Sequence, residues 1–142
     1  MRIVIDTNRI IAALIKEGTA RDILFDPYFE FLTPDYTLVE IEEHIEELKE
    51  KTRLTGEEFK ILMDFIFEDI KIVPSSDYGD FIDECKPLLH DPDDVAHLAT
   101  YLATNAYGIW AHDAHFLTQK KVTVLTNIDM LILSGKANRS ES

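Results

Sequence analysis

The sequence has little cysteine and no long apolar run. Cys85 is the one cysteine among 142 residues, so a fold held by internal disulfides is excluded, and we expect Cys85 to be a small buried side chain. No apolar run is long enough to cross a bilayer, and no basic-then-apolar leader precedes the first apolar run. These absences favour a cytoplasmic protein without a membrane partner.

Basic residues are also few. Lysine and arginine together number 14 against 27 aspartates and glutamates, which gives a formal net charge of −13. This balance argues against a broad basic surface for nucleic acid. A carboxylate-rich metal site, a basic partner and simple solubility are each compatible with it, so charge alone does not choose among them.

Short β-branched runs alternate along the chain with amphipathic segments. The pattern predicts helices between five strands, at residues 3–5, 29–33, 70–73, 109–111 and 122–125. Strands that alternate with helices favour a parallel sheet covered on both faces. At this length we expect one α/β domain over residues 1–135, followed by a polar tail at residues 136–142.

The connection between the second and third predicted strands carries clear helix signals. One long helix is expected from about Tyr36 to Lys51, because Leu38, Ile41, Ile45 and Leu48 form an apolar stripe. Thr55 and Glu58 form a capping box that predicts the start of the next helix.

The first residues of the chain predict a strand, a tight turn and a helix, with an acid at the turn. The first strand ends abruptly at Asp6, and a helical apolar pattern starts at Ile10. Ligands of open parallel sheets bind outside the carboxyl ends of the strands, which is where Asp6 falls. The alternative is that Asp6 only caps the helix that follows, as acids near helix starts often do.

Other acids occupy similar positions, and if the strands that precede them are neighbours, four carboxylates converge on one edge of the sheet. Such oxygen-rich clusters suit Mg²⁺ or Mn²⁺, which can activate water and stabilise an in-line phosphodiester displacement. These four acids lie after the first strand, after the second strand, at the start of the helix before the fourth strand, and after the fourth strand: Asp6, Glu40, Asp94 and Asp113.

Two of these assignments leave alternatives open. With Asp91 as N-cap and Pro92 at the first helical position, Asp94 falls where an acid favours the helix dipole in any case. Asp91 and Asp93 are therefore rivals for a metal role. Spacing alone also does not choose Glu40 over Glu43.

Four segments of the chain together resemble the successive motifs of the PIN-domain family: residues 3–8, 40–44, 93–99 and 109–116. The resemblance implies a three-layer α/β/α sandwich with a central, mainly parallel five-stranded sheet, and a metal-dependent ribonuclease site. It assigns Asp6, Glu40, Asp94 and Asp113 to that acidic site, with Asp6, Asp94 and Asp113 as the ligands of Mg²⁺ or Mn²⁺. Thr7 or Asn8 would support Asp6 by hydrogen bonds.

One position departs from the family pattern. Many relatives have a further acid two or three residues after the position of Asp113, where this chain has His115 and then Phe116. This puts a second metal position in doubt. His115, like His112, is a candidate for binding a metal or a substrate phosphate, although exposed loop histidines commonly have no such role. A zinc site is not favoured, because no thiolate cluster accompanies these histidines.

The resemblance implies an endoribonuclease that acts on RNA. Small relatives are often toxins, so an antitoxin protein is an expected partner, and a homodimer is expected as well. The alternative is a catalytically silent PIN domain that binds protein or RNA. A phosphatase with Asp6 as nucleophile is disfavoured, because the chain lacks a second aspartate two residues later.

Overall fold

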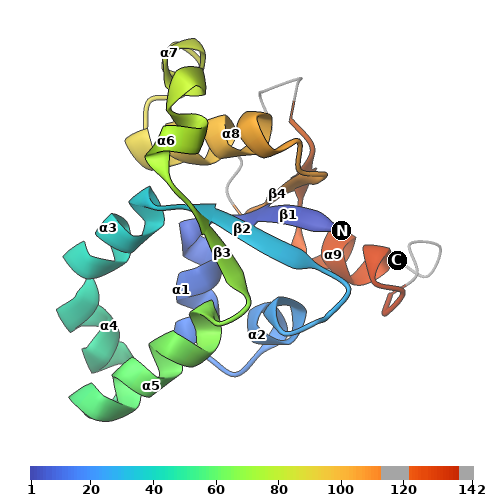
Figure 1. Cartoon of the computed structure of the whole chain (residues 1–142). Coiled ribbons are helices and arrows are strands. Elements are labelled where there is room, and N and C mark those ends of the chain that lie inside the picture. The colour runs from blue at the N-terminus through green and yellow to red at the C-terminus, as the bar shows by residue number, and fades with distance from the viewer. Residues whose placement is uncertain (113–121, 138–142) are drawn as a thin grey trace.

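The computed structural model describes residues 1–112 and 122–137 (Figure 1). Its centre is a five-stranded sheet in which every pairing is parallel, in the order β3-β2-β1-β4-β5. The strands lie close to their predicted positions: β1 Arg2–Ile5, β2 Glu30–Pro34, β3 Ile70–Val73, β4 Gly108–Trp110 and β5 Val124–Leu125.

The strand order makes β1 the central strand. From β1 the chain builds outward through β2 to β3, then crosses to the other side of β1 for β4 and β5. Ile3 pairs with Phe31 of β2, and Ile5 pairs with Trp110 of β4. The strand order thus reverses beside β1, and ligands of such sheets bind in the crevice at that point.

Helices cover both faces of the sheet, which confirms the predicted three-layer α/β arrangement (Figure 1). In the described residues none is long and apolar enough to cross a membrane. In chain order they are α1 Thr7–Ile15, α2 Thr19–Leu24, α3 Tyr36–Glu43, α4 Ile45–Thr52, α5 Gly56–Phe67, α6 Ser75–Tyr78, the 3₁₀ helix η1 Gly79–Phe81, α7 Ile82–Cys85, α8 Pro92–Thr104 and α9 Asn127–Leu133.

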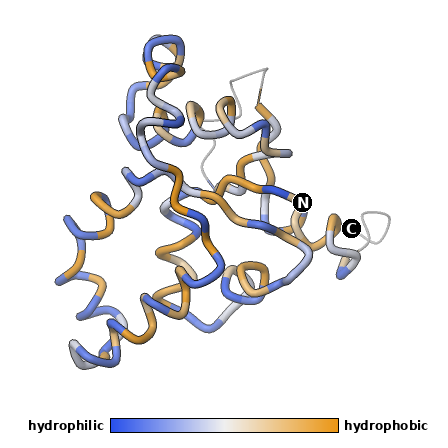
Figure 2. The backbone as a smooth tube through the Cα atoms, viewed as in Figure 1, coloured by the Kyte–Doolittle hydropathy of each residue, from blue (hydrophilic) through white to orange (hydrophobic). Residues whose placement is uncertain are grey.

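Alternate residues of the strands divide the interior into two cores. On one face, Ile3, Ile5 and Trp110 pack with residues of α1, α2, α5 and α9; we call this the α1-side core. On the other face, Val4 and Ile109 pack with residues of α8; we call this the α8-side core. Figure 2 shows the apolar strands running through the middle of the molecule between these layers.

The prediction of one long helix over residues 36–51 is wrong. The chain bends at His44 (φ −110°, ψ 13°), which separates α3 from α4. The bend lets α4 pack against α1 and α5. Ile41 and Leu48 of the predicted stripe are buried, but Leu38 is 43% exposed. Tertiary packing has overridden a helical pattern that is continuous in the sequence.

The predicted helix caps are present. Thr55 and Glu58 form the capping box of α5, and the Asp91 carboxylate accepts a hydrogen bond from the Asp93 amide at the start of α8. Pro92 occupies the first helical position of α8, where its missing N–H costs nothing. These local signals fix where α8 begins, and the functional site depends on that start.

Candidate functional site

Asp6 lies at the carboxyl end of the central strand β1 and is 2% exposed. It occupies the N-cap position of α1, yet its side chain makes no capping hydrogen bond to the backbone of that helix, which is described throughout. Its backbone carbonyl instead accepts hydrogen bonds from the amides of Arg9 and Ile10. The backbone of Asp6 therefore starts the helix, and its carboxylate lies at the end of β1, where the strand order of the sheet reverses.

Asp93, at the second position of α8, brings a second carboxylate to the same place. Its side chain is buried, and its Oδ1 accepts a hydrogen bond of 3.1 Å from the Thr7 hydroxyl. This bond joins the start of α8 to the start of α1. One ligand atom each from Asp6, Asp93 and His97 lie within 4.8 Å of one another. We call these three residues the buried cluster.

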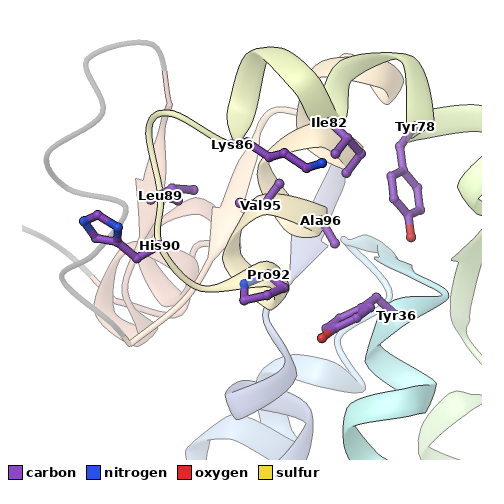
Figure 3. A pocket seen from close by; sticks show the side chains of 9 residues that line it. All are labelled: Tyr36, Tyr78, Ile82, Lys86, Leu89, His90, Pro92, Val95 and Ala96. Atoms are coloured by element: carbon purple, nitrogen blue, oxygen red, sulfur yellow. The ribbon is translucent and has the colours of Figure 1, made fainter.

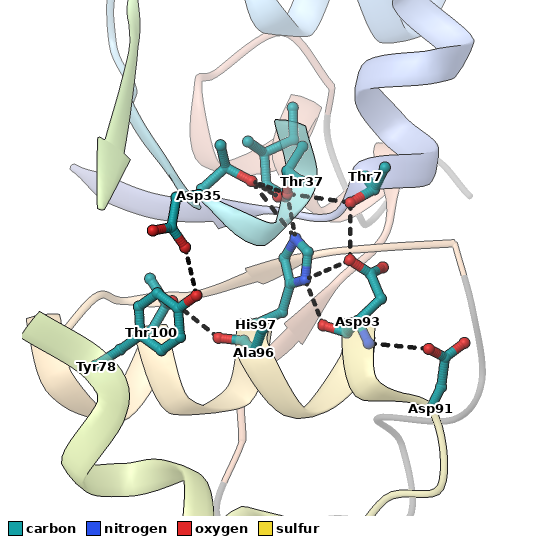
Figure 4. Close-up of polar contacts among 11 residues, drawn as sticks. Thr7, Asp35, Thr37, Tyr78, Asp91, Asp93, Ala96, His97 and Thr100 are labelled. Atoms are coloured by element: carbon teal, nitrogen blue, oxygen red, sulfur yellow. Dashed lines mark hydrogen bonds and ion pairs between the residues drawn. The ribbon is translucent and has the colours of Figure 1, made fainter. Parts of the chain in front are cut away.

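His97 is fully buried one turn after Asp93, and both of its ring nitrogens have partners (Figure 4). Nδ1 lies 2.7 Å from the backbone carbonyl oxygen of Asp93 and 3.4 Å from its Oδ1. Because a carbonyl oxygen only accepts, Nδ1 carries a hydrogen and has no lone pair for a metal ion. Nε2 lies against the Thr37 and Thr33 hydroxyls, so His97 orients Asp93, and the carboxylates are the donors available to a metal ion.

Two buried threonines continue this network beyond Nε2 of His97. Nε2 lies 3.3 Å from the Thr37 hydroxyl and 3.5 Å from the Thr33 hydroxyl. The Thr33 and Thr37 hydroxyls are 2.7 Å apart, and Thr33 donates to the carbonyl of Ile5 at the end of β1. Figure 4 shows His97 and Thr7 meeting at Asp93. The network ties β1, α1, α3 and α8 together around one carboxylate.

Burial and neighbouring charges raise the pKa values of Asp93 and Glu40. Burial is the largest cause of the raised pKa of Asp93, and the Asp6 charge raises it further, while His97 opposes the rise. The pKa of Glu40 is also raised, first by burial and then by the charges of Asp93 and Asp91. Crowded carboxylates resist ionisation together unless a cation compensates them. Their oxygen donors suit Mg²⁺ or Mn²⁺.

The structure brings some of the predicted site residues together. Asp6 and Thr7 belong to the buried site, and Glu40 on α3 lies within electrostatic reach of Asp93. Asn8 is exposed on the first turn of α1.

Asp94 is buried on α8, but it is not one of the described side chains that form the buried cluster. Asp113 and His115 lie outside the described residues, so their roles stay predictions. His112 is described and exposed.

Sequence reasoning treated Asp93 only as a rival and did not select His97. The signal that could have found them is their spacing: residues four apart on a helix share one face, so Asp93 and His97 can act as a pair. Thr33 and Thr37 gave no signal in the sequence, because their contacts depend on how α3 and α8 meet at the end of β1.

Comparison with known proteins gives two positive findings. A family model described as a PIN domain matches residues 4–129. The fold also resembles a chain of the crystal structure of VapBC2 from Rickettsia felis bound to a DNA fragment from their promoter. That alignment has a TM-score of 0.64 at 16% identity and covers 89% of this chain and 98% of the other. No curated protein matched.

Proposed function

Because this chain belongs to the PIN-domain family, we propose that it is a divalent-metal-dependent endoribonuclease that hydrolyses phosphodiester bonds of RNA. The observation that supports this best is the pair of buried carboxylates, Asp6 and Asp93, where the strand order reverses. Buried acids are costly unless they are paired or bind a cation, and raised pKa values often mark functional sites.

In this proposal Asp6 and Asp93 hold Mg²⁺ or Mn²⁺, and Glu40 lies at the edge of the site. Asp94 and Asp113 stay predicted members of it. When bound, the ion supplies an activated water and stabilises charge on the phosphate. Thr7 and His97 keep the Asp93 carboxylate in place, since each makes a contact to its Oδ1.

Arg9 is the cation that we propose for contact with the substrate phosphate. It is half-buried on α1, and the Asp6 charge raises its pKa while burial lowers it by more. Arg21, another basic residue near the start of the chain, is already committed to the fold, because it donates to the carbonyls of Ala13 and Leu14. A guanidinium beside the acids would offset the strongly negative charge of the chain where RNA must approach.

We further propose that the protein is the toxin of a toxin–antitoxin pair, that it acts in the cytoplasm and that it forms a homodimer. The support is family membership together with a fold like that of a chain in a VapBC2 complex. Co-expression with proteins encoded beside it, followed by light scattering of the purified complex, tests the partner and the oligomeric state.

The nuclease proposal is tested by incubating labelled RNA with the protein in Mg²⁺, in Mn²⁺ and in EDTA. We expect cleavage with either metal, none in EDTA, and none by Asp6→Asn. Asp64→Asn, which removes an exposed carboxylate from α5, is the matched control and should cleave like the native chain. RNA binding without cleavage under all conditions would instead favour the silent binding module.

A further inference from the structure

A cavity of about 330 Å³ opens beside the buried cluster, between α3, α6, α7 and α8. Figure 3 shows its wall residues, among them Tyr36, Tyr78, Ile82, Lys86, Pro92 and Val95. We propose that this cavity binds the base of a ribonucleotide whose phosphate lies at the acids. The inference rests on the proposed nuclease function and assigns a base-binding site to it.

The cavity and the acidic site share the first turns of the same two helices. Pro92 of the cavity wall stands between Asp91 and Asp93 on α8. Tyr36 precedes Thr37 of the polar network and lies one turn before Glu40 on α3. A nucleotide bound across this shared edge would have its phosphate at the acids and its base in the cavity.

The wall is suited to a flat, largely apolar ring. The cavity volume is at the lower end of the roughly 300–1,000 Å³ of small-molecule pockets. The Tyr78 ring is held in place, because its hydroxyl donates to Asp35 Oδ1 at 2.5 Å. Aliphatic side chains of Ile82 and Val95 complete the wall. Every base has a π-face that stacks on aromatic side chains, so such a wall accepts a base without needing a matched pattern of donors.

Polar groups border the cavity where a nucleotide would need them. Figure 3 shows the Tyr36 ring below the cavity with its hydroxyl end toward Pro92, and the Lys86 side chain extended over the opposite side near Ile82. Burial and the charges of Glu40, Glu43, Asp93 and Asp91 raise the pKa of Tyr36, so its hydroxyl keeps its proton and can donate to a base edge. Lys86 is exposed on the side of the cavity away from Pro92, and its ion pair with Asp83 is a long 3.9 Å contact, which leaves its ammonium group able to donate to a base edge.

The test is titration of the native protein in EDTA with each of the four ribonucleosides and then with their monophosphates, observed by methyl NMR. We expect saturable shifts confined to the methyls of Ile82, Val95, Leu89 and Ala96, which line the cavity. Tyr36→Leu should weaken binding about tenfold. Tyr107→Leu, which replaces an exposed tyrosine outside the cavity, should not.

A second variant, Lys86→Gln, changes an exposed side chain and tests the proposal without risk to folding. It should weaken the binding of nucleoside and nucleotide alike by about two- to fivefold, because Lys86 borders the base and not the phosphate. Absence of shifts at millimolar nucleoside, or equal shifts with ribose alone, would overturn the proposal. Shifts of these methyls with an apolar peptide but not with nucleotides would also overturn it, in favour of a protein partner.

The outcome is separable from that of the nuclease proposal, because binding in EDTA requires neither metal nor cleavage. If the protein binds nucleotides in the cavity but does not cleave RNA with Mn²⁺, the nuclease proposal is wrong and the base-site proposal still holds. If the protein cleaves RNA but its cavity methyls show no shifts with nucleotides, the base-site proposal alone is wrong.

Discussion

The two cores of this protein are built from different chemistry. In the α1-side core the clustered buried side chains are apolar, and Phe31 and Trp110 lie with ring centroids 5.6 Å apart. On the other face, α8 is buried continuously over residues 93–100, and four of these are Asp93, Asp94, His97 and Thr100. Burying polar groups costs free energy unless they are hydrogen-bonded. The comparison indicates that the α1 face is built for packing, whereas the α8 face combines an apolar core with the buried polar site.

The largest expected effect is on catalysis, and it separates two adjacent acids of α8. We expect Asp93→Asn to abolish metal-dependent RNA cleavage with the fold intact, because it removes a carboxylate of the buried cluster. Cleavage and circular dichroism should be measured for Asp93→Asn, for Asp94→Asn and for the double variant. The sequence predicts the same loss for Asp94→Asn, and a fully active Asp93→Asn protein would transfer the assignment to Asp94.

The next effect is on stability and concerns the apolar face. Phe31→Ala should lower the free energy of unfolding by about 3–5 kcal/mol, since it leaves a cavity against Phe29 and Trp110. Urea unfolding measures this loss. Ile61→Ala on α5, where the side chain is 69% exposed, should change the value by no more than about 0.5 kcal/mol. Similar losses in the two variants would contradict the claim that the packing of Phe31 in the α1-side core stabilises the fold.

A divalent cation should stabilise the polar face. At one hundred times its dissociation constant, an ion that binds only the folded state adds about 2.7 kcal/mol. Thermal melts with EDTA and with millimolar Mn²⁺ should show a higher melting temperature in metal. We expect Asp6→Asn to melt higher than the native chain in EDTA, because it relieves repulsion, and to lose most of the response to metal. An equal shift in both proteins would place the ion elsewhere.

Because Asp93 and Glu40 take up protons as the pH falls, we expect the stabilisation by Mn²⁺ to depend on pH. The folded-state pKa values of Asp93 and Glu40 are raised above those of the unfolded chain. Their destabilising effect is therefore fully present above the folded values and is relieved as pH falls toward the unfolded values. Across that window, the stabilisation by Mn²⁺ should shrink as protons replace the ion.

The smallest effect tests the network that holds Asp93. His97→Leu should cost about 1–3 kcal/mol, because the Asp93 carbonyl and the Thr37 hydroxyl lose a buried partner. His44→Leu, at the exposed bend between α3 and α4, is the control and should cost much less. Urea unfolding of both variants gives the difference. A negligible loss in His97→Leu would show that the polar network does not stabilise the fold.

Much of the fold could be predicted, because strands and caps are local features. Each of these features is encoded within a few residues, as in the β-branched run before Asp6, the capping box at Thr55 and the Asp91–Pro92 start of α8. The bend at His44 could not be predicted, since Ile41, Ile45 and Leu48 continue one helical stripe through it. Contacts of α4 with α1 and α5 decided it.

By itself, the sequence determined that an acid follows the central strand and that two more begin α8. Tertiary structure decided that Asp93 and His97 come together with Asp6. Successive residues of an α-helix point about 100° apart, so the rotation of α8 on the sheet decides which of its side chains face Asp6, and packing sets that rotation. The same packing brings Thr37 to His97, although they are 60 positions apart in the chain.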